Sequence, residues 1–190
     1  MLIACLLPLA AAAQVVCALG PGAAGYKASE DKHPTADAME LVGGTYAAGK
    51  SVCGANCPEV ILFRNTTASN VMLVTDAGRA KIVYNPAFIT SVYDRYGDAG
   101  VQGVMAHEIG HALDDALGAA WIEKSWTPEL RADSWAGCIL AKSNLSPAEV
   151  TAALAALAAH PSPAHPGWNV RLPAIRAGYA RCGGAVKNPQ

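Results

Sequence analysis

Residues 104–113 read VMAHEIGHAL, and residues 127–133 read TPELRAD. The first segment contains His107 and His111, with Glu108 directly after the first histidine. Side chains four residues apart lie on one face of an α-helix, so both imidazoles can reach the same ion. The apolar residues on either side of the motif predict a buried helix. This H-E-x-x-H pattern is typical of a zinc site in which the glutamate takes a proton from water.

The second segment offers further acidic side chains on the next predicted helix. Two antiparallel helices joined by a turn can bring Glu129 beside the histidine pair, and three protein ligands leave the fourth zinc position open. Asp133 lies one turn after Glu129 and can accept a hydrogen bond from the outer N–H of a ligand histidine. We therefore expect one Zn2+ per chain, with ligands His107, His111 and Glu129 and with Glu108 as the general base.

The motif and the ELRADSWAG segment that follows it resemble the gluzincin type of zinc metallopeptidase. They are most similar to the HtpX and CAAX-prenyl-protease superfamily and to related small bacterial neutral zinc peptidases, over roughly Ile82 to Arg176. The resemblance implies a zincin-like fold, the same ligands and base, and hydrolysis of peptide bonds in a polypeptide substrate, which we expect to be endoproteolytic. The metzincin pattern does not fit, because Asp114 and Leu117 stand where it requires glycine and histidine.

A third element of the resemblance lies near the C-terminus. His165-Pro166 and Arg171 are similar to a His-Pro and Arg pair of the same superfamily. The resemblance implies that His165 stabilises an oxyanion or gates the cleft, and that Arg171 pairs with Asp133 or another acid near the site. His160-Pro161 is an equally good candidate for the His-Pro position.

The N-terminus and the cysteines predict export. Residues 1–13 are apolar and end in small residues, which is typical of a signal peptide cut after Ala13. A lipoprotein anchor at Cys5 is less favoured because no hydrophobic run precedes it. We expect a periplasmic or secreted protein and no transmembrane span in the mature chain. The predicted disulfides are Cys53–Cys57 and Cys138–Cys182, which leaves Cys17 odd; a four-cysteine zinc site is disfavoured by the irregular spacing.

The pattern along the chain predicts an α+β fold, with a small N-terminal sheet followed by a mainly helical catalytic half. We expect a loop-rich segment over 14–57, with one helix around Ala36–Val42, and a zincin-like domain over 58–190. Strands are predicted at 60–63, 71–74 and 80–84, and helices at 87–96, 99–117, 128–142, from 147 to before 160, and 169–181. The strand Lys81–Asn85 is our candidate for the cleft rim that pairs with substrate, and an ordinary strand of the small sheet is the equal alternative.

Composition and context exclude other functions. Charged residues make up only 15% of the 190 residues and the net charge is -1, so we expect no nucleic-acid partner. Residues 44–51, GTYAAGKS, match the phosphate-binding loop by letter, but the Cys- and Pro-containing segment after Ser51 cannot supply the helix that such a loop requires. We therefore expect no nucleotide. The alternative to a peptidase is a catalytically silent zincin-like protein that binds or chaperones a polypeptide or envelope partner. The sequence does not indicate an oligomeric state.

Overall fold

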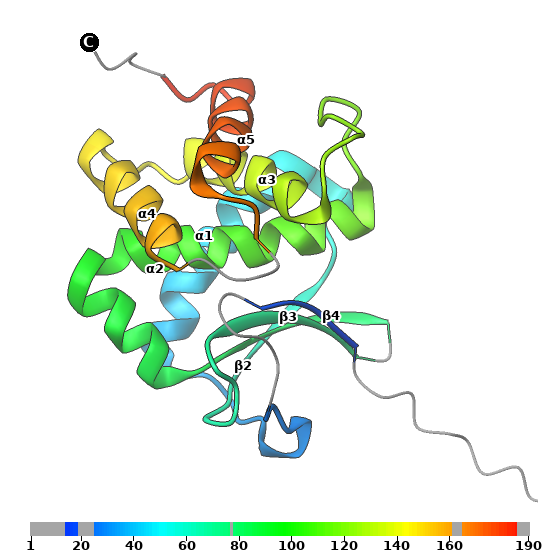
Figure 1. Cartoon of the computed structure of the whole chain (residues 1–190). Helices are drawn as coiled ribbons and strands as arrows, with labels where there is room; N and C mark the ends of the chain where they lie inside the picture. Colours follow the sequence, from blue (N-terminus) through cyan, green and yellow to red (C-terminus); the bar gives the residue numbers. More distant parts are fainter. Residues whose placement is uncertain (1–13, 19–24, 77, 161–164, 186–190) are drawn as a thin grey trace, which may run out of the picture.

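A computed structural model describes residues 14–18, 25–76, 78–160 and 165–185 of the chain (Figure 1). The elements follow one another as β1 (Gln14–Ala18), α1 (Ala36–Cys53), β2 (Val60–Arg64), β3 (Val71–Asp76), β4 (Arg79–Tyr84), α2 (Pro86–Leu117), α3 (Pro128–Lys142), α4 (Pro147–Ala159) and α5 (Trp168–Arg181), with 3-10 turns at Ala28–Glu30 and Gly54–Asn56. The predicted α+β class is confirmed. The signal peptide predicted for 1–13 lies outside the described residues.

The four strands form one sheet in the order β1-β3-β4-β2. β3 pairs antiparallel with both β1 and β4, whereas β2 pairs parallel with β4. Our prediction that Lys81–Asn85 forms the cleft rim is wrong, because β4 lies between two strands and both of its edges are already paired. The strand order depends on contacts between distant segments, which the local pattern does not contain.

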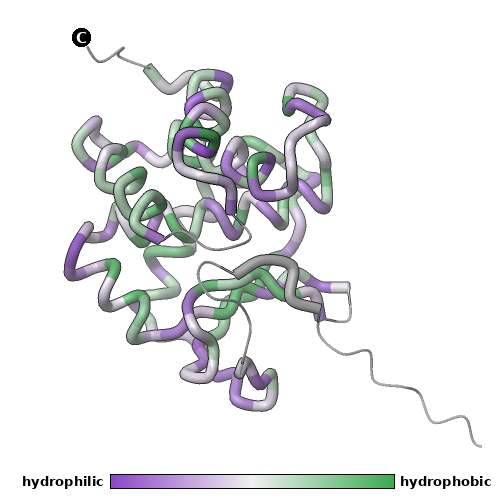
Figure 2. The backbone as a smooth tube through the Cα atoms, viewed as in Figure 1, coloured by the Kyte–Doolittle hydropathy of each residue, from purple (hydrophilic) through white to green (hydrophobic). Residues whose placement is uncertain are grey.

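The long helix α2 lies between the sheet and the helices α3 and α5 (Figure 1). Asn85 caps its N-terminus by accepting a hydrogen bond from the Ala87 N–H, and Pro86 occupies the first turn. Gly97 has φ 66° and divides α2 at a kink. The two segments on either side correspond to the separate helices predicted at 87–96 and 99–117. The main core is formed by α2 together with the sheet and buried residues of α1, α3 and α4, and β3 and β4 are largely hydrophobic in Figure 2.

Helix α1 corrects the expectation of a loop-rich segment over 14–57. The predicted helix around Ala36–Val42 extends to Cys53, despite three glycines within it. A Cβ built at Gly49 would lie 3.5 Å from a side-chain carbon of Ile109 on α2, which is ordinary van der Waals contact, and Gly49 is buried. Burial against α2 and α3 therefore outweighs the low helix propensity of glycine. Residues 44–51 lie inside this helix and do not form a phosphate-binding loop.

Both predicted disulfides are present. Cys53 is bonded to Cys57 just after α1, and Cys138 on α3 is bonded to Cys182 at the end of α5. The second bond closes a loop of 44 residues and ties the helix that carries ELRAD to the C-terminal helix. In the described part of the chain, no helix has the length and apolar character to cross a bilayer.

Helices α3 and α5 approach so closely that their backbones touch at glycines. A Cβ at Gly178 would lie 1.7 Å from the Ser134 carbonyl oxygen, and one at Gly137 would lie 1.9 Å from the Ile175 carbonyl oxygen. No side chain fits at either position without separating the helices. The contact therefore sets the distance between α5 and the ELRAD segment.

We expect Gly178→Ala to lower the free energy of unfolding by about 1–3 kcal/mol, because the added methyl group overpacks this contact. The matched control is Gly43→Ala on α1, where a Cβ meets nothing within 4 Å. That control should stabilise the protein by about 0.5–1 kcal/mol through helix propensity. Urea unfolding measures both values, and equal effects of the two variants would contradict the packing argument.

Candidate metal centre

Helices α2 and α3 bring the predicted ligands together. His107 and His111 lie on one face of α2, and Glu129 lies in the first turn of α3. A Cβ at Gly110 would lie 2.4 Å from the Ala132 carbonyl oxygen, so the glycine within the motif lets α3 approach α2 closely. The helix start at Thr127, whose side chain accepts a hydrogen bond from the Leu130 N–H, then places Glu129 over the histidine pair.

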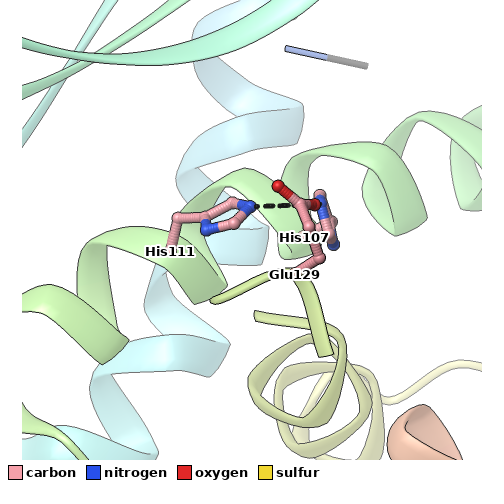
Figure 3. A group of neighbouring side chains, drawn as sticks. All are labelled: His107, His111 and Glu129. Atoms are coloured by element: carbon pink, nitrogen blue, oxygen red, sulfur yellow. Dashed lines mark hydrogen bonds and ion pairs between the residues drawn. The ribbon is translucent and has the colours of Figure 1, made fainter. Parts of the chain in front are cut away.

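The three donor atoms have the spacing of a tetrahedral metal site. The Nε2 atoms of His107 and His111 are 3.3 Å apart. Glu129 Oε2 lies 3.3 Å from the first and 3.5 Å from the second. Ligands of a tetrahedral zinc ion with bonds of about 2.0–2.1 Å are separated by about 3.3 Å. Figure 3 shows the two imidazoles and the carboxylate directed at one another, so the residues fit a single zinc ion.

The orientation of His107 is fixed from behind by a buried chain of hydrogen bonds. Its Nδ1 lies 2.9 Å from Asp133 Oδ1, and both side chains are completely buried. Arg171 on α5 donates to both oxygens of Asp133, through Nε at 2.8 Å and Nη2 at 2.7 Å. The Asp133 carboxylate accepts a hydrogen bond from Nδ1, so Nε2 is the ring nitrogen of His107 that faces His111 and Glu129. The predicted pairing of Arg171 with Asp133 is thus present.

The charges around the cluster favour a cation. Burial opposes ionisation of Asp133, but its hydrogen bonds with Arg171 and His107 lower its pKa below the usual value. Burial likewise opposes ionisation of Glu129, yet hydrogen bonds with His107, His111 and His165 lower its pKa strongly. Burial lowers the pKa of His111, which favours its neutral imidazole. Ionised carboxylates and a neutral imidazole are the protonation states that metal ligands need.

His107 shows the opposite tendency. Burial disfavours its charged form, but hydrogen bonds with Asp133 and Glu129 outweigh burial and raise its pKa to about 9. The site therefore stabilises positive charge at this position. A proton on Nε2 and a metal ion compete for the same lone pair, so metal binding releases a proton from this residue.

Glu108 is buried beside the cluster, and neither oxygen of its carboxylate has a hydrogen-bond partner in the described part of the chain. Burial is the main cause that raises its pKa to about 8, although the charge of His107 opposes the shift. The backbone of Leu73 on β3 also opposes the shift, and β3 packs against α2, the helix that carries Glu108. A buried carboxylate without a partner indicates a missing polar group, such as water beside a metal.

His165, not His160, lies at the cluster. Its Nε2 is 2.7 Å from Glu129 Oε2 and 3.3 Å from His107 Nε2. The ring of His160 instead packs edge-on against Phe88, with ring centroids 4.9 Å apart. The structure therefore separates the two His-Pro candidates that the sequence left equal.

Two features of the site were not predicted from the sequence. Gly110 provides the close approach of α3, and the signal available was the glycine before the second histidine of the motif. The Leu157 carbonyl oxygen on α4 lies 3.5 Å from Arg171 Nη1, and no sequence signal identifies a backbone acceptor of this kind. Together with the predicted residues, they place α2, α3, α4 and α5 around one site.

Replacing Asp133 with alanine should lower the free energy of unfolding by about 3–5 kcal/mol, because it leaves the Arg171 guanidinium buried without its counter-ion. The double variant Asp133→Leu/Arg171→Leu removes both charges and should recover most of the loss. Urea unfolding of the metal-free proteins tests this. A double variant that is less stable than Asp133→Ala would contradict the assignment.

The pKa of Glu108 predicts a pH-dependent effect of Glu108→Gln on the metal-free protein. Because the folded-state value is raised, ionising this residue destabilises the fold as pH rises from about 4.5 to about 8. Glutamine removes that cost, so the variant should melt at a higher temperature than the parent at pH 8.5. The two should melt alike at pH 4.5. A difference that is independent of pH would show that Glu108 is not held in its protonated form.

No protein-family model matches the chain, and no curated protein and no solved structure matches it either.

Proposed function

We propose that this chain is a zinc-dependent metallopeptidase of gluzincin type, with a zincin-like fold. The observation that carries the proposal is the spacing of His107 Nε2, His111 Nε2 and Glu129 Oε2, which matches the edges of a tetrahedral zinc site. The unpartnered carboxylate of Glu108 supports a hydrolytic role, because a site that only holds metal has no need of a buried base. Extended polypeptides are the substrates, and cleavage is endoproteolytic.

Zinc bound at this site would act as a Lewis acid toward the scissile carbonyl and increase the acidity of water. Glu108 accepts the proton of the attacking water and passes it to the leaving amine. A nearby cation lowers the raised pKa of Glu108, so the carboxylate is ionised when metal is present. His165 donates a hydrogen bond to the oxygen that becomes negative in the transition state. Asp133 and Arg171 keep His107 in the ligand orientation.

Export is part of the same proposal. Two disulfides in a chain of this size are typical of proteins that mature in an oxidising compartment. We propose that residues 1–13 act as a signal peptide and that the protein works in the periplasm or outside the cell.

The test combines metal analysis with peptide cleavage. The purified parent should hold one zinc per chain and cleave a random peptide library. Glu108→Gln should keep the zinc and lose cleavage by about 10²-fold or more, because the general base is absent. His111→Ala should lose both zinc and activity, whereas Glu123→Gln, a matched change at an exposed glutamate, should alter neither.

Cleavage by Glu108→Gln at the parental rate would overturn the mechanism. Zinc binding without cleavage by the parent would favour the alternative, a catalytically silent protein that binds or chaperones a polypeptide.

A further inference from the structure

The edge of β3 that β1 covers lies beside the candidate catalytic residue. The Asn85 N–H donates to the Asn70 carbonyl oxygen at 2.7 Å. Because hydrogen-bonding direction alternates along a strand, the N–H and C=O groups of Asn70, Met72 and Val74 face β4. Those of Leu73 face the opposite edge, where β1 pairs with β3. β3 also packs against α2, the helix that carries Glu108. A polypeptide that reaches Glu108 in extended form therefore meets the Leu73 edge of β3.

That edge is taken by the chain's own N-terminal strand. β1 runs antiparallel to β3, with Cys17 opposite Leu73 and Val15 opposite Val74. β1 also contacts α2, the helix that carries the ligands, and it lies along the sheet edge that faces α2 in Figure 1. One edge of a strand pairs with one partner at a time, so β1 and an extended substrate compete for the same backbone groups.

β1 can separate from β3 while the rest of the sheet stays paired. Its pairing with β3 shifts register between Val15 and Cys17, and such a bulge interrupts the hydrogen-bond ladder. The other strands hold one another without it, because β3 and β4 form a hairpin and β2 pairs with β4. Detaching β1 therefore exposes the β3 edge and leaves the sheet beneath the catalytic helix in place.

We propose that β1 occupies the polypeptide-binding edge of β3 as an internal competitor of substrate, and that an extended polypeptide binds by replacing it as the antiparallel partner at Leu73. This inference rests on the proposed function for its catalytic consequence, but the competition for the edge can be measured without catalysis. The occupant of the edge is residues 14–18, and the ligand that replaces it is any unfolded segment able to pair as a strand.

The binding test uses a peptide with the sequence of the occupant itself. The probe is a fluorescein-labelled peptide of residues 12–20, with serine in place of Cys17, and fluorescence anisotropy measures its Kd for the full chain carrying Glu108→Gln. Adding Cys17→Pro removes the N–H that faces Leu73, and loss of one such hydrogen bond should lower the peptide's Kd about tenfold by freeing the edge.

Two matched controls separate the backbone effect from others. Ala18→Pro places the same residue where the N–H faces away from β3, and Cys17→Ser removes the thiol but keeps the N–H. Neither change should alter the peptide's Kd from the value measured for the chain that carries Glu108→Gln alone. Should Cys17→Pro fail to unfold cooperatively, Gln14→Pro repeats the test at the other position of β1 that faces β3. Equal Kd values for the β3-facing proline variant and the controls would overturn the proposal.

A cleavage assay with Glu108 intact distinguishes this proposal from the proposed function. Competition by β1 predicts that Cys17→Pro lowers the KM for library peptides and leaves kcat unchanged. If no variant cleaves but the Kd difference is present, the peptidase function is wrong and the assignment of the edge is supported. If all variants cleave the library with the same KM and bind the labelled peptide with the same Kd, the peptidase function is supported and the role of β1 is overturned.

Discussion

The buried hydrogen-bond chain from Arg171 through Asp133 to His107 is the constraint on which the rest of the structure depends. A carboxylate and a guanidinium without solvent are costly unless each has its counter-ion and further hydrogen bonds. Here each partner comes from a different helix, α5, α3 and α2. Satisfying these charges therefore requires three helices to meet at one point, and the same point orients the imidazole that faces the donor cluster.

Glycines allow α2, α3 and α5 to pack this closely. Gly110 brings α3 onto α2, and Gly178 brings α5 onto α3, in both cases to a backbone carbonyl of the neighbouring helix. The hydrogen bonds fix the angular placement of the helices, while these contacts fix their separation. Both are needed because donor atoms about 3.3 Å apart tolerate little displacement around one ion.

The elements with strong local signals could be predicted from sequence, because their determinants lie within a few residues. The H-E-x-x-H spacing, the caps at Thr127 and Ser146 and the strand at Val71 belong to this class, and Arg171 and His165 came from a resemblance. The length of α1 and the central position of β4 could not be predicted. The first depends on packing of glycine-containing turns against α2, and the second depends on which distant strands pair. Sheet order is a property of long-range contacts, so the wrong cleft rim followed from treating Lys81–Asn85 alone.

Glu108 links the stability of the fold to the proposed chemistry. A buried carboxylate without a partner is unfavourable in a protein selected only for stability, and this one lies where Leu73, His107 and Glu129 all affect its pKa. A cation among His107, His111 and Glu129 would favour the ionised form of Glu108 by direct attraction. The same ion would also remove the need for a proton on His107. His107 and Glu108, whose pKa values hydrogen bonding and burial respectively raise above the usual range, would thus both lose a proton on binding a cation, which is the direction that the proposed hydrolysis requires.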